Sequence, residues 1–398
     1  MKLTPFHERT AALNRQQMWF NWDRHIVPDV YTDVREELRA TRQAASMGDM
    51  SPLSKYVLRG PDAAGVLDRI VTRDVAGLDV GQVVYTSWTD EAGKVVGDGL
   101  VFRTGAEEFR LTADPQLVWL TRHVAGADVL IDDVTDAFGL LAVQGPRSRD
   151  VMRAVTGSSW DDLEFSRTRT TTVVGAEVLV SRQGFTGEIG FELWVPAASG
   201  VAVWDEVAAA GAASGIHPVG EYAIDLARVE AGLLIVGADY TGAGPDRPGT
   251  MIELSPGYVA SPFEIGLGSF VDLGKPGFIG RDALVAESAD GSGARLVGLE
   301  LDREAIVRLG VEGGTPAVVP SRVWWYPLEV RADGRSVGRA TSVTWAPTVG
   351  RVVGFGHLPA DLSGPGTEVT VRWTLNGVEG DVPATVVDLP FLELRRTG

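Results

Sequence analysis

The segment Ser181-Arg182-Gln183-Gly184-Phe185-Thr186-Gly187-Glu188-Ile189-Gly190-Phe191-Glu192 lies at the junction of two predicted β-strands. Ala176–Ser181 comes before it and Gly190–Val195 forms its end, and both runs are rich in the residues that strands favour. Two further strand candidates precede them, Thr168–Val174 and the largely apolar Phe138–Gln144. The centre of the chain is therefore predicted to be rich in buried β-structure.

Helical patterns alternate with these strands. Arg147–Val155, Gly200–Gly211 and Ile224–Leu234 are predicted helices, the last because its apolar residues recur on one face. Residues 56–130 are also mixed: the predicted strands are Gln82–Trp88, Gly99–Arg103 and Glu108–Thr112, and the predicted helices are Asp62–Val71 and around Pro115–Val124. This order predicts an α+β fold rather than a regular βαβ series.

The composition changes after Leu284. Ala286–Gly293 is small and polar, which is typical of a linker. Beyond it, Gly and Pro turns separate four predicted strands: Arg295–Leu301, Leu328–Arg331, Thr367–Trp373 and Val382–Val387. Short strands with this spacing predict a small antiparallel barrel or sandwich.

Bulk properties exclude several classes of function. The chain has 398 residues, a net charge of −17 and no cysteine, and its five histidines are scattered. The charge argues against a nucleic-acid partner, and the absence of cysteine and of metal-binding spacings predicts no metal site. The N-terminus lacks a signal-peptide pattern and no apolar run is long enough to span a membrane, so we expect a cytoplasmic protein with no membrane partner.

Five ordered motifs give a more specific indication. Together they resemble the glycine-cleavage T-protein (aminomethyltransferase) family. The motifs are Thr4–His7, Leu141–Pro146, Ser181–Glu192 (the family's SRxGYTGExGFE), Pro262–Gly268 with Lys275–Arg281, and Gly338–Ser342 with Ala346–Gly350.

The resemblance implies a three-domain folate-binding fold around a central channel, with tetrahydrofolate as cofactor. We expect residues 1–55 and 135–285 to form a discontinuous folate-binding core. Residues 56–134 would form an inserted α+β domain carrying Asp98, and residues 294–398 a C-terminal β-barrel domain.

The same resemblance implies the site residues. Asp98 matches the family's catalytic aspartate, although taken alone an aspartate between glycines is usually part of a turn. Glu192 matches the carboxylate that pairs with the pterin, whose two adjacent donors suit an acceptor-only partner; without the motif it would be read as an exposed strand residue. Phe185, which stands where many relatives have Tyr, is a further expected cofactor contact, together with Arg228 and Tyr240.

Departures from the family pattern indicate which branch of the family this chain resembles. Lys275–Arg281 lacks the cysteine of the iron–sulfur-assembly branch, and no residues are left for the flavin domain of an oxidase. Ile224 stands where aminomethyltransferases have an arginine thought to contact the folate tail, so another cation such as Arg182 or Arg247 would have to serve. This loss, the Gly-Asp-Gly around Asp98 and an aromatic-rich N-terminus favour the folate-dependent demethylases.

The expected reaction is therefore transfer of a methyl group from a small O-, S- or N-methylated substrate, giving 5-methyltetrahydrofolate. Asp98 would stabilise the cationic N5 and accept its proton. Aromatic residues could form a cation–π cage or a ring slot for the substrate, unless they are core residues; the candidates are Trp19, Trp22, His25, Tyr31 and Tyr85. Two alternatives stay open: an aminomethyltransferase acting with a lipoyl carrier and giving 5,10-methylenetetrahydrofolate, and a non-catalytic folate-binding protein. The oligomeric state is not predicted.

Overall fold

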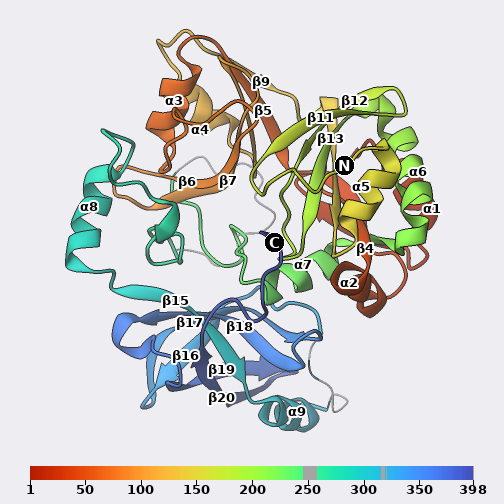
Figure 1. The fold of residues 1–398 in the computed structure, drawn as a ribbon. Coiled ribbons are helices and arrows are strands. Elements are labelled where there is room, and N and C mark those ends of the chain that lie inside the picture. Colours follow the sequence, from red (N-terminus) through yellow and green to blue (C-terminus); the bar gives the residue numbers. More distant parts are fainter. Residues whose placement is uncertain (245–257, 315–318, 320, 398) are drawn as a thin grey trace.

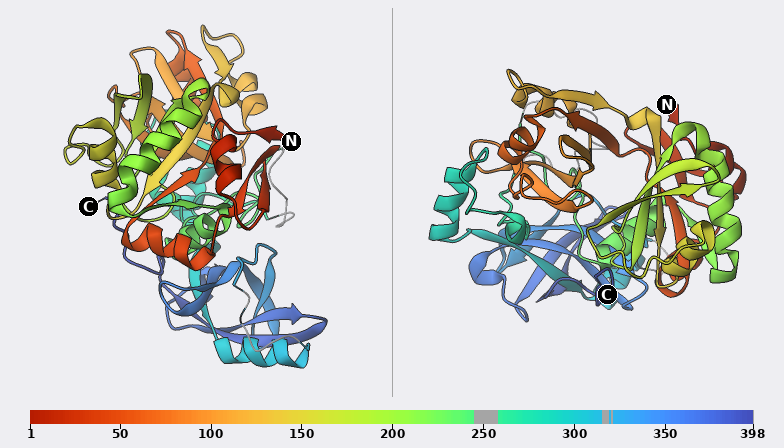
Figure 2. Two further views of the ribbon diagram at one scale, coloured as in Figure 1. Left: turned by 90° about the vertical axis from the view of Figure 1, so that its right-hand side faces the viewer. Right: turned by 45° about the horizontal axis from the view of Figure 1, so that its top comes forward.

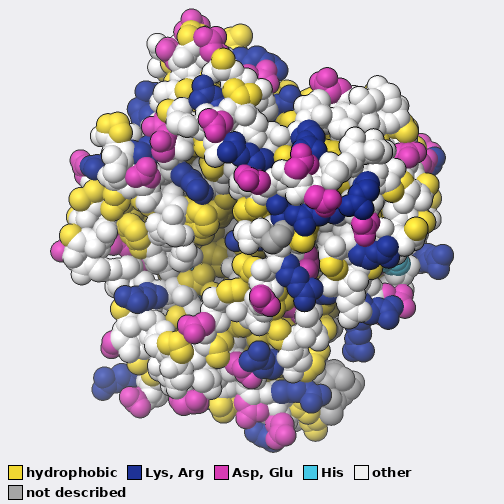
Figure 3. Space-filling view, in the orientation of Figure 1, with side chains coloured by type: hydrophobic (Ala, Val, Ile, Leu, Met, Phe, Trp, Pro, Cys, Tyr) yellow, Lys and Arg dark blue, Asp and Glu magenta, His cyan; other side chains and the backbone are white. Residues whose placement is uncertain are grey.

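A computed structural model describes residues 1–244, 258–314, 319 and 321–397 (Figure 1). Its helices and sheets gather into three lobes around a centre that helix α7 (Glu221–Glu230) borders (Figures 1 and 2). The space-filling view shows a hollow between the lobes with apolar side chains on its wall (Figure 3). No helix in the described part of the chain is both long and apolar enough to cross a membrane.

The first lobe is built on a six-stranded sheet with the order β11-β12-β13-β10-β4-β14. Its strands are β4 (Ala45–Asp49), β10 (Phe138–Gln144), β11 (Thr168–Val173), β12 (Ala176–Ser181), β13 (Gly190–Pro196) and β14 (Ile216–Val219). Helices α1 (His7–Leu13), α5 (Ser148–Thr156) and α6 (Gly200–Gly211) cover its outer face (Figure 1). The apolar side chains of Phe191, Leu193 and Val195 point from β13 toward these helices and form a fully buried core with them.

A smaller sheet, in the order β1-β3-β2, extends this lobe at the N-terminus. It consists of β1 (Lys2–Leu3), β2 (Met18–Trp22) and β3 (His25–Val30). Asp23 and Arg24 form the two-residue turn between β2 and β3, with φ of 39° and 67°, the left-handed geometry of a tight hairpin. Helix α2 (Val34–Gln43) follows, and the side chain of Asp33 caps it by accepting from the backbone N–H groups of Arg35 and Glu36.

The second lobe holds a five-stranded sheet in the order β6-β7-β8-β5-β9. The strands are β5 (Ser54–Arg59), β6 (Val83–Thr89), β7 (Val95–Arg103), β8 (Glu108–Ala113) and β9 (Leu130–Asp133), and helices α3 (Ala63–Ile70) and α4 (Leu117–His123) belong to the same lobe. The strands β6, β7 and β8 form an antiparallel meander. Side chains of this sheet, Val83 and Phe102, pack with Leu140 and Trp194 of the first sheet, so the two lobes share an apolar interface.

The third lobe is a closed barrel in the order β15-β18-β17-β16-β19-β20. Its strands are β15 (Ala294–Leu301), β16 (Leu328–Ala332), β17 (Arg335–Ala346), β18 (Arg351–Pro359), β19 (Glu368–Leu375) and β20 (Val378–Val387), with α9 (Arg303–Glu312) at its side. Short 3₁₀ turns complete the chain at Thr135–Ala137, Ala197–Ser199, Ala212–Ser214, Gly268–Phe270 and Ala360–Leu362. The mixed fold and the C-terminal barrel predicted from the sequence are confirmed.

Two sequence-based predictions were wrong in detail. The expected linker at Ala286–Gly293 is largely helical, because α8 (Arg281–Asp290) continues through its Ala- and Glu-containing part and ends only at Gly291, with φ 85°. Helix α7 begins before Ile224, at Glu221, after an extended Gly220, and it ends at Glu230. Gly232, with φ 71°, turns the chain away from the helix axis before Leu234.

Two of the motifs that resemble the family, Lys275–Arg281 and Ser181–Glu192, contain residues with structural roles. The Nζ of Lys275 donates to three backbone carbonyls, those of Asp68, Val71 and Arg73, and so ties the end of α3 to the chain beyond α7. Buried Arg42 pairs with Glu188 of the Ser181–Glu192 segment at 3.2 Å. A motif in the sequence therefore does not by itself mark a ligand-binding residue.

Candidate active site

Asp98 lies on β7 and receives two tyrosine hydroxyl groups. Tyr85, on the neighbouring strand β6, donates to Oδ2 at 2.6 Å. Tyr240, from the loop after α7, donates to Oδ1 in a short hydrogen bond. Strand pairing sets the first contact, and the turn of the chain after α7 sets the second. The carboxylate is thereby held by donors from both the second lobe and the segment that borders the centre.

In the group formed by Asp98, Tyr85 and Tyr240, the tyrosines keep their protons and Asp98 is the carboxylate that accepts from them. Burial raises the pKa of Asp98, and the two tyrosine hydrogen bonds lower it again in part. Burial, followed by the negative charge of Asp98, raises the pKa of Tyr85 and of Tyr240 well above the usual range. Because both oxygens of Asp98 accept, the arrangement suits a carboxylate that can stabilise a nearby cation or take up a proton.

The glycines beside Asp98 are required by packing. A Cβ at Gly97 would lie 2.9 Å from the ring of Trp88, and one at Gly99 would lie 2.3 Å from the carbonyl oxygen of Thr112. The Gly-Asp-Gly pattern is thus explained by close contacts with neighbouring strands. It carries no information on the identity of the substrate.

Asp114 is a residue of this site that the sequence reasoning missed. It follows β8 directly, and the antiparallel pairing of Gly99 with Ala113 places it opposite Asp98 when the register is continued by one residue. Burial, and then the charges of Asp98 and Asp23, raise the pKa of Asp114 to about 7. The available signal was an aspartate at the end of the strand next to that of Asp98 in a predicted meander.

Glu192 lies on β13 with its side chain on the inner face of the first sheet. Its cross-strand partner is Ala142, and the adjacent pair Leu140 and Trp194 packs on that same face against the second lobe. The Glu192 side chain is 7% exposed. Within the described residues its carboxylate has no hydrogen-bond partner, and burial alone raises its pKa to about 7. An unpaired, buried acceptor is what a ligand with adjacent N–H donors requires.

The other predicted cofactor residues fall into different settings. Phe185 is half-buried against the same apolar cluster as Ile224, near the inner face of the sheet. Arg228 is fully buried, and each of its guanidinium nitrogens donates within the protein, to Asp225, Asp239 and Ser342 among others. Arg228 therefore does not fit the expected cofactor contact, because its side chain is fully buried and four of its five N–H donors bond within the protein. Tyr240 reaches Asp98 as described above.

The five aromatic residues predicted to bind the substrate lie in different parts of the structure. Tyr85 binds Asp98, and His25 lines a pocket. Tyr31 and Trp22 are core residues, 1% and 7% exposed, and Trp19 packs against His7 at 5.4 Å between ring centroids. No aromatic cage formed by these residues is present in the described chain.

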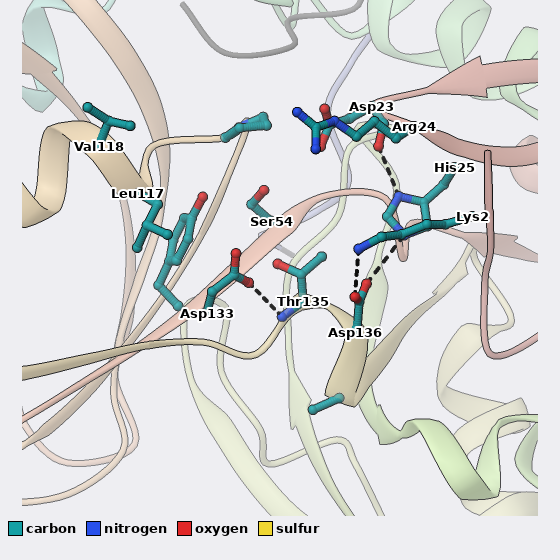
Figure 4. A pocket seen from close by; sticks show the side chains of 13 residues that line it. Lys2, Asp23, Arg24, His25, Ser54, Leu117, Val118, Asp133, Thr135 and Asp136 are labelled. Atoms are coloured by element: carbon teal, nitrogen blue, oxygen red, sulfur yellow. Dashed lines mark hydrogen bonds and ion pairs between the residues drawn. The ribbon is translucent and has the colours of Figure 1, made fainter. Parts of the chain in front are cut away.

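The pocket that contains His25 has a volume of about 580 Å³ (Figure 4). It lies where the β2–β3 turn meets β5, the start of α4 and the segment around Asp136. In Figure 4, Lys2 and His25 both point toward Asp136, at 2.6 Å and 3.7 Å. Among the described residues no group of three or more His, Asp or Glu side chains comes together as metal ligands.

The C-terminal tail also approaches the centre. The backbone N–H groups of Arg395 and Arg396 donate to the carbonyl of Gly187, at 2.8 and 3.1 Å. Burial lowers the pKa of the half-buried Arg396, whose positive charge offsets a small part of the rise in the pKa of Tyr85. Arg396 makes no ion pair with a described carboxylate and lies over the ring of Phe165. Arg247, considered above as a substitute cation, lies outside the described residues.

Comparison with known proteins settles the family. Residues 6–246 match the GCVT N-terminal domain and residues 295–393 the glycine cleavage T-protein C-terminal barrel domain. The chain is 31% identical over 398 residues to the aminomethyltransferase of Halothermothrix orenii, which covers 98% of this chain and 100% of the relative. It is 33% identical to that of Rubrobacter xylanophilus, with 100% and 95% covered. The chain belongs to the glycine cleavage T-protein (aminomethyltransferase) family.

The fold of the family is shared throughout. The crystal structure of glycine cleavage system aminomethyltransferase T from Bartonella henselae matches with a TM-score of 0.82 and 24% identity, covering 100% of this chain and 99% of that one. The resemblance inferred from the five motifs is confirmed, and so is the prediction of a transferase of this family.

The preference for a methyl-removing demethylase was wrong. The relatives that match over the whole chain are named aminomethyltransferase. Two of the features behind that preference have structural explanations: packing requires Gly97 and Gly99, and two of the N-terminal aromatics, Trp22 and Tyr31, belong to the core. The third, Ile224, is a core side chain at 7% exposure.

Proposed function

We propose that this protein transfers a one-carbon unit at the aminomethyl level to tetrahydrofolate, giving 5,10-methylenetetrahydrofolate, ammonia and the free thiol of the reduced lipoyl group. The observation that carries the proposal is the unpaired, buried carboxylate of Glu192, in a chain related over its full length to aminomethyltransferases. The donor is an aminomethyl group held on a lipoyl carrier protein. A cytoplasmic location stays a prediction from the sequence.

Glu192 suits the pterin end of the cofactor. A carboxylate offers two acceptors side by side and no donor, and the pterin presents its 2-amino and N3–H groups in the same arrangement. Burial without a partner is costly for a carboxylate, as the pKa of about 7 reflects. Two ligand donors would remove most of that cost, so binding would lower the pKa of Glu192.

Arg396 suits the opposite, anionic end of the cofactor. Ile224 supplies no charge, and the guanidinium groups of Arg228 and Arg42 are already committed to buried carboxylates. Arg396 is half-buried beside the site and makes no described ion pair, so a carboxylate ligand could pair with it. The C-terminal tail would thus supply the cation that Ile224 does not.

Asp98 would handle charge and protons at the reacting carbon. Tetrahydrofolate, when bound, supplies the nitrogen nucleophiles that take up the carbon. The fixed carboxylate of Asp98 would stabilise positive charge as it develops and accept a proton, while Tyr85 and Tyr240 keep it ionised and in place. The hydrogen bonds require no reorientation during the reaction, which is how preorganised groups lower a barrier.

The test is incubation of the protein with tetrahydrofolate and an aminomethylated lipoyl carrier protein. Mass spectrometry follows the folate species, and ammonia is measured in parallel. We expect 5,10-methylenetetrahydrofolate and ammonia in equal amounts, with both lost in Asp98→Asn. Tight folate binding without either product would contradict the proposal and favour a non-catalytic folate-binding protein.

A further inference from the structure

The pocket of about 580 Å³ has a charged end and an apolar end. The two residues of the β2–β3 turn, Asp23 and Arg24, both line it. Figure 4 shows Leu117 and Val118, from the first turn of α4, on the opposite side of the cavity. Their side chains are 37% and 47% exposed, so the apolar end is open to solvent. The cavity therefore suits a small molecule with charge at one end and apolar surface at the other.

The other charged side chains of the pocket have partners within the protein. The carboxylate of Asp136 pairs with Lys2 at 2.6 Å and lies 3.7 Å from Nε2 of His25. The carboxylate of Asp133 accepts a hydrogen bond from the backbone N–H of Thr135 at 3.0 Å. These contacts hold this part of the wall together without a ligand.

The charges of the turn residues are not paired in this way. Within the described residues, neither the carboxylate of Asp23 nor the guanidinium of Arg24 makes a hydrogen bond or a close ion pair. Asp23 is half-buried and Arg24 is exposed at the mouth of the same cavity. The turn therefore presents one negative and one positive group, from consecutive residues, to whatever fills the pocket.

The backbone of the turn is also unusual for these two residues. Asp23 and Arg24 have φ of 39° and 67°, the region that a tight hairpin requires and that Asn-Gly adopts most easily. Hydrogen bonds to the two carbonyl groups hold this geometry: the backbone N–H of Lys2 donates to that of Arg24 at 2.6 Å, and Nδ1 of His25 donates to that of Asp23 at 3.0 Å. A costly backbone conformation that is fixed at a cavity wall is a feature of ligand-binding sites.

We propose that this pocket binds an α-amino acid zwitterion with an apolar side chain, whose carboxylate pairs with Arg24 and whose ammonium pairs with Asp23. An α-amino acid carries both charges on one carbon atom, so it needs two opposite charges side by side, and consecutive residues of a tight turn supply them. A guanidinium can bind a carboxylate through two parallel N–H groups, and a carboxylate is an acceptor-only partner for an ammonium. The apolar side chain would lie on Leu117 and Val118.

This site is distinct from the folate site proposed above. None of the residues assigned to tetrahydrofolate or to the reacting carbon lines the pocket. The inference therefore goes beyond the proposed function and does not depend on it.

The experiment measures binding by NMR titration at about pH 7, without tetrahydrofolate. The probes are L-leucine, 3-methylbutylamine, which is leucine without its carboxylate, and 4-methylpentanoate, which is leucine without its ammonium. We expect the wild-type protein to bind L-leucine about tenfold more tightly than either of the other two, the size of effect that one charge-assisted hydrogen bond supplies. Glycine, which keeps both charges and lacks the apolar part, should also bind more weakly than L-leucine.

Two variants separate the roles of the turn residues. Asp23→Asn should lose the preference for L-leucine over 4-methylpentanoate and keep the preference over 3-methylbutylamine. Arg24→Gly should show the reverse pattern. Asn and Gly both suit a positive φ, so each variant should keep the turn and have a Tm no lower than that of the wild type. Asp282→Asn and Arg308→Gln, which change an exposed carboxylate on α8 and an exposed guanidinium on α9, should keep both preferences.

Binding of 3-methylbutylamine or 4-methylpentanoate as tightly as L-leucine by the wild-type protein would overturn the inference, and this comparison needs no variant to fold. Both preferences surviving in Asp23→Asn and in Arg24→Gly would also overturn it. Glycine binding as tightly as L-leucine would overturn the assignment of the apolar end. Because no turnover is measured, these results are independent of whether the protein makes 5,10-methylenetetrahydrofolate.

Discussion

Tyr85 and Tyr240 donate to different oxygens of one carboxylate, that of Asp98. Tyr85 lies on β6, the strand next to that of Asp98. Tyr240 comes from the loop after α7, which is far from β7 in the sequence. Asp98 is thus held by one local contact and one long-range contact. The second depends on the packing of two lobes, so the ionisation of Asp98 is coupled to the assembly of the fold.

Removing either hydroxyl should weaken catalysis and shift its pH dependence. Tyr85→Phe and Tyr240→Phe each leave one oxygen of a half-buried carboxylate without its donor, and a hydrogen bond to a charged group contributes about 1.5–3 kcal/mol. We expect kcat/KM to fall about tenfold to a hundredfold. Since these hydrogen bonds lower the pKa of Asp98, their loss should move the acidic limb of the pH–rate profile to higher pH.

Tyr326→Phe is the matched control for these variants, because Tyr326 is 57% exposed on the barrel lobe. It should leave both the rate and the pH profile unchanged. An unshifted acidic limb in Tyr85→Phe and Tyr240→Phe would show that Asp98 is not the group that titrates in the reaction.

Glu192→Gln should make the ligand-free protein more stable while abolishing folate binding. The pKa of Glu192 is about 7 in the folded protein, whereas the ordinary value of a glutamate, which we take for the unfolded chain, is 4.5. A raised carboxyl pKa costs no stability below pH 4.5; the cost grows as pH rises from there to about 7 and is then constant. At pH 8 the cost is on the order of 3 kcal/mol, so the variant should have the higher Tm there and nearly the same Tm at pH 4.5.

Calorimetry at the two pH values checks the stability part, and a fluorescence titration with tetrahydrofolate checks binding. A variant that binds tetrahydrofolate as the wild type does would contradict the assignment of Glu192 to the pterin, whatever its Tm.

Much of the fold was predictable because its local signals agree with its tertiary packing. Helix α6 and strands β10 and β12 occupy the ranges expected from apolar pattern and turn residues. The prediction was weaker where packing decides. β17 and β18 were not predicted as strands. They pair with each other in the barrel, and β18 also pairs with β15 and β17 with β16, which supplies the hydrogen bonds that stabilise them.

The site was predictable only in part, for a related reason. Glu192 and Asp98 could be found by motif, since both stand in segments of distinctive sequence. Arg228 could not be assigned, because whether an arginine faces a ligand or a buried carboxylate depends on residues far along the chain, such as Asp239 and Ser342. Asp114 was missed because its significance lies in a cross-strand register that the sequence does not state.

Arg228→Met should destabilise the fold rather than weaken cofactor binding specifically. Arg228 is fully buried and pairs with Asp225 at 2.8 Å and Asp239 at 2.6 Å. Removing one partner from a buried ion pair leaves uncompensated charge and costs about 3–5 kcal/mol. Thermal unfolding should show a clear loss of Tm. A variant with wild-type Tm and a large rise in Kd for tetrahydrofolate would restore the original prediction that Arg228 contacts the cofactor.

His357 should make the protein less stable as the solution becomes mildly acidic. It is 3% exposed on β18, and in the described chain neither ring nitrogen has a hydrogen-bond partner. Burial lowers its pKa to about 4, against smaller opposing effects of Asp239 and Glu264. A lowered histidine pKa means that stability is complete above the ordinary value of 6.5 and is lost as pH falls toward 4, because the unfolded chain binds the proton first. Between pH 6.5 and 5 the loss is about 2 kcal/mol.

His357→Leu isolates this contribution. Leucine fits a buried position that offers the ring nitrogens no partner, and it cannot titrate. The variant should lose less Tm between pH 7 and 5 than the wild type, and the difference between the two proteins should no longer change with pH above pH 7. The exposed carboxylates titrate below this range and affect both proteins alike, so they cancel in the comparison. Parallel Tm curves for the two proteins from pH 7 to 5 would mean that the pKa of His357 is the same in the folded and unfolded states.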